Sequence, residues 1–182
     1  IAHPPLDTAQ CREILQNGRN GLRQTYLTKG NAAALLLGHS RLVDKLLQTI
    51  WRQLSLPPSS ALIAVGGYGR EQLFPGSDTD LLILLPSDPD EILGQKLEQL
   101  VGLLWDIGLE VGHSVRTLPE CLEESKDITV QTNLLEARFL LGDKKLFDEM
   151  VTRFDKQVVQ GTGPDFVAAK LTERWGQSVI VD

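Results

Sequence analysis

Two short apolar runs constrain the fold of this chain more than any other feature of its sequence. Residues 61–65 read Ala-Leu-Ile-Ala-Val, and residues 81–85 read Leu-Leu-Ile-Leu-Leu before a proline. An unbroken apolar run of this length, ended by glycine or proline, is typical of a strand that is covered on both faces. We therefore predict strands at 61–65 and 79–85, in a sheet with helices on both sides.

Helices are predicted before, between and after these strands. Apolar residues recur there at helical spacing, and capping residues precede several of the stretches. A third strand is expected at 109–116. The pattern favours an α/β fold of the α+β type, a small mixed sheet flanked by helices. The expected helices cover residues 7–28, 31–54, about 90–108, a short stretch after Thr117, 127–142, 143–158, and a last stretch after a hinge at 161–164.

The order of these elements predicts three parts. Residues 1–56 form an N-terminal helical segment, residues 57–142 form the α/β core, and residues 143–182 form C-terminal helices. The chain begins with Ile1 rather than methionine. We therefore expect these residues to be a piece cut from a longer protein.

Composition limits the class of partner. The formal net charge of −6 disfavours a nucleic-acid surface, because such surfaces neutralise phosphates with Lys and Arg. The net charge does not exclude a single small binding site for a phosphate ligand. No apolar run reaches the roughly 18–20 residues of a membrane span. Cys11 and Cys121 lie far apart and form no metal-binding pair, so free thiols in a cytoplasmic protein are expected.

Asp78 and Asp80 flank the start of the second predicted strand. In a strand, side chains two residues apart share one face and lie about 6.6 Å apart along the chain. Two carboxylates placed in this way can converge on Mg²⁺, which takes one or two carboxylates together with waters and substrate phosphates. Without a cation they would repel each other and raise a pKa. We therefore predict a metal site at these two aspartates.

Glycines follow the first predicted strand. Gly66 and Gly67 lack side chains that would keep backbone N–H groups away from a triphosphate. Arg70 can add a charge-assisted contact, and a helix over residues 69–74 would add favourable potential for the anion. Ser77 either touches a phosphate or caps the turn before the aspartates. The glycines complete neither GxGxxG nor a P-loop, so the argument depends on their combination with the Asp-x-Asp strand.

That combination resembles the polymerase-beta-like nucleotidyltransferase superfamily, whose signature is an apolar residue with Gly-Gly or Gly-Ser, followed by Asp-x-Asp in a strand. Longer stretches resemble the N-terminal nucleotidyltransferase domain of bacterial PII uridylyltransferase/uridylyl-removing enzymes. The core predicted at 57–142 would then be a nucleotidyltransferase domain. The stretches are residues 66–70 (GGYGR), 75–78 (PGSD), 105–117 (WDIGLEVGHSVRT) and 134–138 (LLEAR).

The resemblance implies transfer of UMP from UTP to a tyrosine of the small signalling protein PII, with release of pyrophosphate, as part of nitrogen regulation. Gly66 and Gly67 would hold the triphosphate. Asp78 and Asp80 would bind Mg²⁺, with Mn²⁺ as the alternative metal. The family's metal-dependent HD hydrolase domain is not expected within these residues, because the sequence has no His-Asp dipeptide.

Two positions depart from the family pattern. Glu71-Gln72 stands where the family usually has Gly-Glu, and Thr79 replaces a usual aliphatic residue between the aspartates. Neither change removes a proposed ligand, but the first alters the loop expected to hold phosphate.

A third carboxylate on a neighbouring strand is also implied by the resemblance. Glu110, between Leu109 and Val111 in the third predicted strand, is the candidate for a metal ligand or for the base that accepts the proton of the incoming hydroxyl. An ordinary edge-strand glutamate is an equal alternative. Asp106 is a poorer candidate, since it is expected in the preceding helix.

Other residues leave two interpretations open. Arg116 and Arg138 could contact phosphate or form structural ion pairs, and Tyr68 could stack on a base or pack on the domain. At the level of function, the alternatives are a non-catalytic nucleotide-binding or regulatory module, and a nucleotidyltransferase that uses another nucleotide and acceptor.

Overall fold

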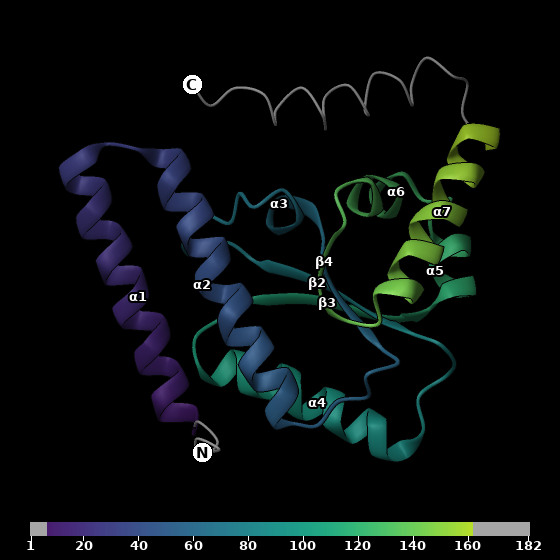
Figure 1. Ribbon diagram of the computed structural model, residues 1–182, viewed down its shortest axis with the longest axis horizontal. Coiled ribbons are helices and arrows are strands. Elements are labelled where there is room, and N and C mark those ends of the chain that lie inside the picture. The colour runs from purple at the N-terminus through teal and green to yellow at the C-terminus, as the bar shows by residue number, and fades with distance from the viewer. Residues whose placement is uncertain (1–6, 162–182) are drawn as a thin grey trace.

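The computed structural model describes residues 7–161, which are built around a four-stranded mixed sheet with helices on both faces (Figure 1). The strands lie in the order β3-β2-β1-β4. Strand β1 is antiparallel to both of its neighbours, whereas β2 and β3 are parallel. The strands are β1 (Ala61–Ala64), β2 (Thr79–Leu85), β3 (Val111–Thr117) and β4 (Arg138–Gly142).

Helices precede, connect and follow the strands. Capping aspartates begin several of them: Asp7, Asp90 and Asp127 each accept a hydrogen bond from a backbone N–H in the first helical turn. Such bonds satisfy donors that the helix itself leaves without a partner. The helices are α1 (Thr8–Lys29), α2 (Ala32–Gln53), α3 (Gly66–Gly69), α4 (Glu91–Asp106), α5 (Leu118–Glu124), α6 (Ile128–Leu135) and α7 (Lys144–Gly161).

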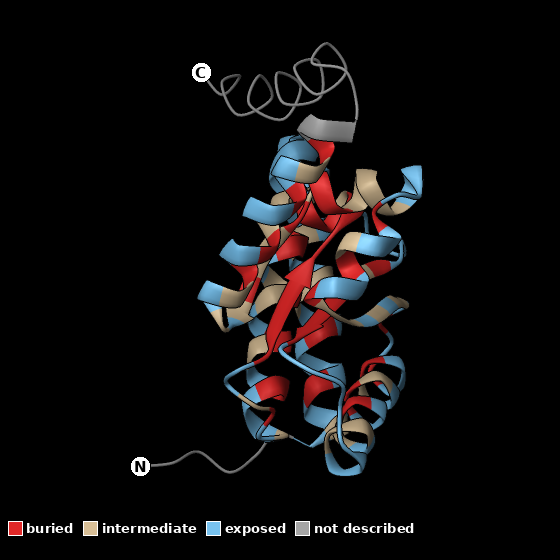
Figure 2. Cartoon of the chain, turned by 90° about the vertical axis from the view of Figure 1, so that its right-hand side faces the viewer, coloured by how far each residue is buried: buried red, intermediate tan, exposed pale blue. Residues whose placement is uncertain are grey.

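Each face of the sheet has its own core, and Figure 2 shows the buried residues along the strands and the inner sides of the helices. Leu81 and Ile83 of β2 pack on one face with residues of α1, α2 and α4. Leu82 and Leu84 pack on the other face with residues of α5, α6 and α7. Because successive strand residues point to opposite faces, Asp80 points toward the second face.

The predicted fold class, a mixed sheet flanked by helices, is confirmed, but one predicted element is wrong. The helix expected over 127–142 ends at Leu135, and strand β4 follows at Arg138–Gly142. Residues 139–141 form a short apolar run, which periodicity alone cannot assign to helix or strand. Pairing with β1 selects the strand conformation, because β4 forms hydrogen bonds with the backbone N–H and C=O groups on the edge of β1 that does not face β2.

Other expectations concern the chain as a whole. Within residues 7–161, no helix is long and apolar enough to cross a membrane. Cys11 and Cys121 are free and buried, as expected. The division into 1–56, 57–142 and 143–182 stays a prediction. The hinge and last helix expected after residue 161 lie outside the described residues.

Candidate active site

The two predicted metal ligands lie together at the start of β2. Asp80 is the second residue of the strand and is partly buried, whereas Asp78 precedes the strand and is exposed. Burial raises the pKa of the Asp80 carboxyl, and the charge of Asp78 raises it further. Among the described residues, no hydrogen-bond donor or cation pairs with either carboxylate. Two adjacent acids without a partner form a place where a cation would be stabilised.

Two glycines make room for the Asp80 carboxylate. Gly66 has a φ of 57°, and a Cβ atom there would lie 3.2 Å from Asp80 Oδ2. Gly112 of β3 pairs with Asp80 in the sheet, and a Cβ atom there would lie 2.5 Å from Asp80 Oδ1. The carboxylate therefore occupies space that a side chain at either glycine would fill. Gly112 was not predicted as a site residue, and its steric role depends on the register of β2 and β3.

Gly112→Ala is expected to lower any activity that depends on the Asp80 carboxylate by roughly 100-fold, because its methyl group would displace this carboxylate by about 1 Å. The carboxylate can rotate away, so the fold should survive. Gly102→Ala on α4 is the matched control, since a Cβ atom there meets nothing within 4 Å. It should keep full activity. Turnover rates and urea denaturation of both variants check this, and equal activity in the two would contradict the steric argument.

The helix considered over residues 69–74, which would have added favourable potential for an anion, does not form. Helix α3 is a single turn that ends at Gly69, and residue 71 leaves the helical region with a φ of 59°. Glu71 thus holds a left-handed backbone conformation that L-residues other than glycine adopt at a cost. This explains why glycine suits position 71 in the family that the sequence resembles, and why a helix cannot continue through it.

Glu71→Gly is expected to raise the free energy of unfolding by about 1 kcal/mol, because it relieves the left-handed strain. Glu71→Ala is the control: it removes the same carboxylate and keeps the strain, so no gain is expected. Urea denaturation measures the free energy of unfolding of both variants. An increase of the same size in both would assign the effect to the lost charge rather than to backbone conformation.

Arg70 and Ser77 already have protein partners. The Arg70 guanidinium contacts Glu136 at 2.5 Å, and its Nε donates to Gln72 Oε1 at 3.2 Å. The guanidinium nitrogen lies 3.8 Å from the position of a Cβ atom on Gly67, so it stands beside the glycine-rich turn. Ser77 Oγ donates to the carbonyl of Phe74 at 2.9 Å, which is the turn-capping arrangement. Phosphate contacts by Arg70 and Ser77 stay predictions.

Glu110 is exposed and lies just before β3 rather than within it. Its carbonyl oxygen accepts a hydrogen bond from the Thr79 N–H at 2.7 Å, which places its backbone next to the aspartate pair. Its charge also acts on Arg19 of α1. No cluster of three or more acidic, His or Cys side chains is assembled within the described part of the chain. The role of Glu110 as third ligand or base therefore stays a prediction.

A buried polar network supports the glycine-rich turn from behind. The Tyr68 hydroxyl donates to Asp44 Oδ1 at 2.5 Å, and burial raises the pKa of this hydroxyl. Arg138 donates to both Asp44 oxygens, at 2.8 and 3.1 Å, and to the Tyr68 carbonyl at 3.3 Å. The structure thus assigns packing to Tyr68 and an ion pair to Arg138. Asp44 was not predicted, because its partners lie far away in the sequence.

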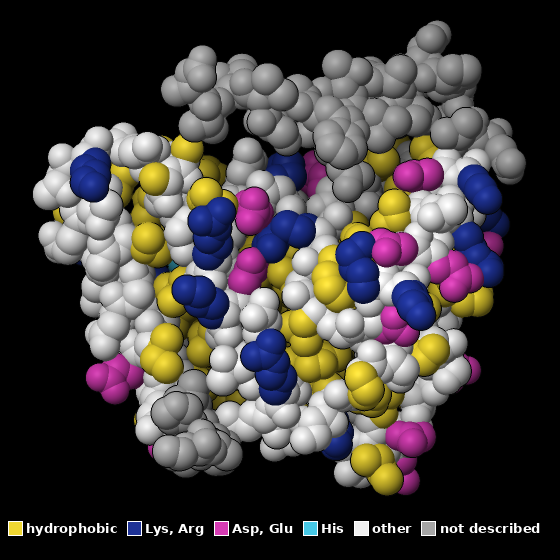
Figure 3. Space-filling view, in the orientation of Figure 1, with side chains coloured by type: hydrophobic (Ala, Val, Ile, Leu, Met, Phe, Trp, Pro, Cys, Tyr) yellow, Lys and Arg dark blue, Asp and Glu magenta, His cyan; other side chains and the backbone are white. Residues whose placement is uncertain are grey.

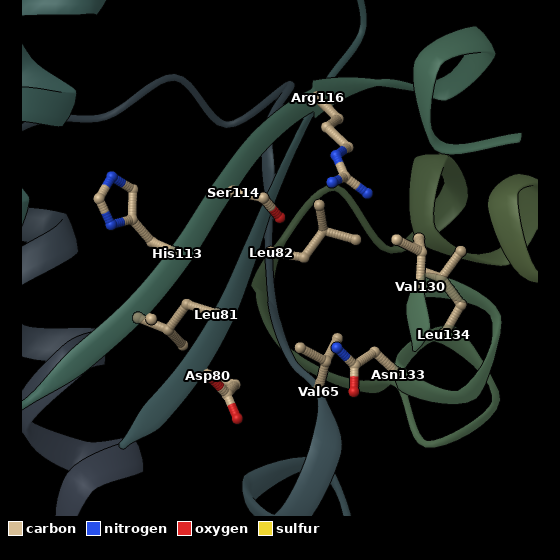
Figure 4. A pocket seen from close by; sticks show the side chains of 11 residues that line it. Val65, Asp80, Leu81, Leu82, His113, Ser114, Arg116, Val130, Asn133 and Leu134 are labelled. Atoms are coloured by element: carbon tan, nitrogen blue, oxygen red, sulfur yellow. The ribbon is translucent and has the colours of Figure 1, made fainter. Parts of the chain in front are cut away.

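A hollow of about 210 Å³ opens beside Asp80, between β2, β3 and α6 (Figure 4). The side chains of Ser114 and Arg116 of β3 and Asn133 of α6 point into it, while His113 points away. Its apolar walls include Leu82, Val130 and Leu134. Arg116 makes a long ion pair, 4.0 Å, with Glu124, and its charge also acts on Glu120.

Charged side chains of both signs lie on the face that carries α2 and α3. Figure 3 shows Lys and Arg side chains across the middle of this face, with Asp and Glu side chains among them. Arg70 supplies positive charge beside the glycine-rich turn, and local positive charge attracts an anionic ligand irrespective of the net charge of −6.

Comparison with known proteins assigns the family. Residues 44–137 match the family described as "Nucleotidyltransferase domain", and the chain belongs to this family of enzymes. Curated relatives named "Bifunctional uridylyltransferase/uridylyl-removing enzyme" are similar over most of the chain. The protein of Nitrosospira multiformis is 53% identical over 154 residues, which are 81% of this chain and 17% of the relative. The protein of Cupriavidus metallidurans is 52% identical over 165 residues, which are 90% of this chain and 19% of the relative. The chain thus spans less than a fifth of these relatives.

Proposed function

We propose that this chain transfers UMP from UTP to a tyrosine of a PII-type signalling protein and releases pyrophosphate. The observation that carries the proposal is the pair Asp78 and Asp80, which lies beside Gly66 at the mouth of a buried strand and has no hydrogen-bond or ion-pair partner within residues 7–161. The nucleotidyltransferase family and the uridylyltransferase names of the similar proteins support the type of reaction.

The aspartate pair fits a divalent cation. Both carboxylates are accessible, Asp80 lies between two glycines, and their mutual repulsion favours a bound positive charge. Asp78 and Asp80 would hold Mg²⁺, or Mn²⁺, because carboxylate oxygens suit these ions. When bound, the ion would neutralise charge on the phosphates and on the leaving pyrophosphate.

The glycine-rich turn would hold the triphosphate. Position 66 requires glycine because its φ is positive and because a Cβ atom there would crowd the Asp80 carboxylate. A Cβ atom on Gly67 would make only ordinary van der Waals contacts, the nearest at 3.7 Å. Packing alone therefore does not demand glycine at position 67. Close approach of a phosphate to the backbone would supply the reason.

The chemical step joins the tyrosine oxygen to the α-phosphorus of UTP. The bond from this phosphorus to the oxygen that bridges the β-phosphorus breaks, and pyrophosphate departs with the electron pair. The tyrosine proton passes to a base, for which Glu110 is the proposed residue. Its backbone bond to Thr79 brings it near the aspartate pair, which supports this role.

The test is a transfer assay with purified chain, Mg²⁺, PII and each of four labelled nucleoside triphosphates. We expect label from UTP alone to reach PII, with pyrophosphate released in equal amount. PII with its acceptor Tyr→Phe is the control and should stay unlabelled. Saturable UTP binding without transfer would overturn the catalytic proposal in favour of a non-catalytic nucleotide-binding module. Transfer of another nucleotide would overturn the choice of UTP.

A further inference from the structure

We infer that the hollow beside Asp80 binds the uracil ring of the nucleotide and that Arg116 determines the choice of base. This inference deepens the proposed function and rests on it for the identity of the substrate. Asp80 lines one end of the hollow, and the polar side chains of Arg116, Asn133 and Ser114 point into it. None of these three is among the metal and phosphate ligands proposed above.

The place of the hollow separates the base from the phosphates. Arg116 pairs with Leu84 in the sheet, four residues along β2 from Asp80. The strand rise puts these positions about 13 Å apart. The glycine-rich turn lies at the Asp80 end, so a nucleotide with its triphosphate at that end would extend its sugar and base along β2 and β3 toward Arg116.

The size of the hollow indicates how much of the nucleotide it takes. Its volume of about 210 Å³ is below the roughly 300–1,000 Å³ of pockets that enclose a whole drug-sized ligand. It therefore accommodates a part of a nucleoside triphosphate. The apolar side chains of Leu82, Val130 and Leu134 give it walls suited to the faces of a small flat ring.

The polar groups decide which ring fits. A guanidinium has only donors, so Arg116 can pair with a carbonyl oxygen and cannot pair with an amino group. Uracil carries carbonyl oxygens at both ends of its N3–H edge, whereas cytosine carries an amino group at one end. The Asn133 amide has both donors and an acceptor, and its Oδ1 lies 3.5 Å from the position of a Cβ atom on Gly66, at the Asp80 end of the hollow. A contact of Arg116 with the carbonyl at the end of the ring where cytosine carries its amino group would favour uracil over cytosine, whereas the carbonyl at the other end is common to both bases.

Arg116 is available for this contact. Its ion pair with Glu124 is at the limit of such interactions, 4.0 Å, and the Glu124 side chain is 56% exposed. Glu120, on which the charge of Arg116 also acts, is exposed to solvent. Figure 4 shows the guanidinium directed from β3 toward the space between Leu82 and Val130. A ligand carbonyl in this space would gain a charge-assisted hydrogen bond.

The experiment measures equilibrium binding of UTP and CTP with Mg²⁺ by calorimetry, so it does not depend on transfer. Wild-type chain should bind UTP at least about tenfold more tightly than CTP, since a hydrogen-bonding site discriminates against a ligand lacking the matching group. Arg116→Gln should reduce this preference to about twofold or less, because its amide can also accept. Arg116→Lys, which keeps a donor-only group, should retain most of it.

Arg153→Gln on α7 is the matched control and should leave both affinities unchanged, because Arg153 pairs with Glu149 on the same helix. Circular dichroism confirms folding of each variant. An equal loss of affinity for UTP, CTP, ATP and GTP in Arg116→Gln would assign Arg116 to phosphate and overturn the inference. Equal binding of UTP and CTP by wild type would also overturn it. A UTP preference that depends on Arg116, found in a chain that transfers nothing to PII, would support the inference while the proposed function fails.

Discussion

Asp80→Asn is expected to lower nucleotidyl transfer by at least about 10³-fold, because it removes a carboxylate proposed to hold the metal against the phosphates. Asparagine keeps the size of the side chain and one oxygen, so the space between Gly66 and Gly112 stays filled. Asp88→Asn is the matched control: Asp88 is exposed in the loop before α4, and its substitution should leave activity unchanged. The rate at which label is transferred to PII measures the activity of both variants.

The same variant should not lose stability. Burial and Asp78 raise the pKa of the Asp80 carboxyl, so its ionised form is disfavoured in the metal-free fold. A carboxyl whose pKa is higher in the folded than in the unfolded state lowers stability at pH values above that pKa, and this cost disappears as pH falls through it. Asp80→Asn should therefore match or exceed the wild-type free energy of unfolding at pH 7 without metal, with the difference shrinking in acid.

Urea denaturation with and without Mg²⁺ completes the test. Wild type should gain stability on addition of Mg²⁺ because only the folded chain presents the carboxylate pair, and Asp80→Asn should gain less. Full transfer activity in Asp80→Asn would contradict the metal assignment. A large loss of stability would instead mean that Asp80 has a structural role.

Asp44→Ala is expected to lower the free energy of unfolding by about 3 kcal/mol, because it leaves a half-buried guanidinium and a buried hydroxyl without their common partner. Asp44 accepts hydrogen bonds from both Tyr68 and Arg138, and so joins α2 to α3 and β4. Its side chain is 15% exposed. Because Tyr68 lies within α3, loosening this network should also reduce transfer.

Asp148→Ala is the matched control. Asp148 pairs with Lys144 on the surface of α7, where both side chains are 57% exposed. Exposed pairs contribute little, so a change within about 0.5 kcal/mol is expected. Urea denaturation measures both variants. A similar small effect of the two would show that the Asp44 network does not stabilise the fold.

The site illustrates which inferences local sequence supports. Asp78 and Asp80 are predicted together from two neighbouring positions, and they lie together at the start of β2, with Asp78 just before the strand and Asp80 within it. Burial raises the pKa of the Asp80 carboxyl, and the charge of Asp78 raises it further, which is the direction expected for two neighbouring carboxylates. The one-turn length of α3 was missed, since the left-handed conformation of Glu71 depends on the closure of a loop between two strands.

The sequence by itself determined the elements whose signal lies within one segment: the two buried strands, the long helices with their caps, and the paired aspartates. Only the tertiary structure decided β4, the partnership of Asp44 with Arg138, the space between Gly66 and Gly112, and the hollow at Arg116. Each of these depends on segments far apart in the chain, for instance Asp44 and Arg138. Hydrogen-bond pairing between strands and burial between layers select among local conformations that the sequence leaves nearly equal, and for that reason they emerge only when the chain is folded.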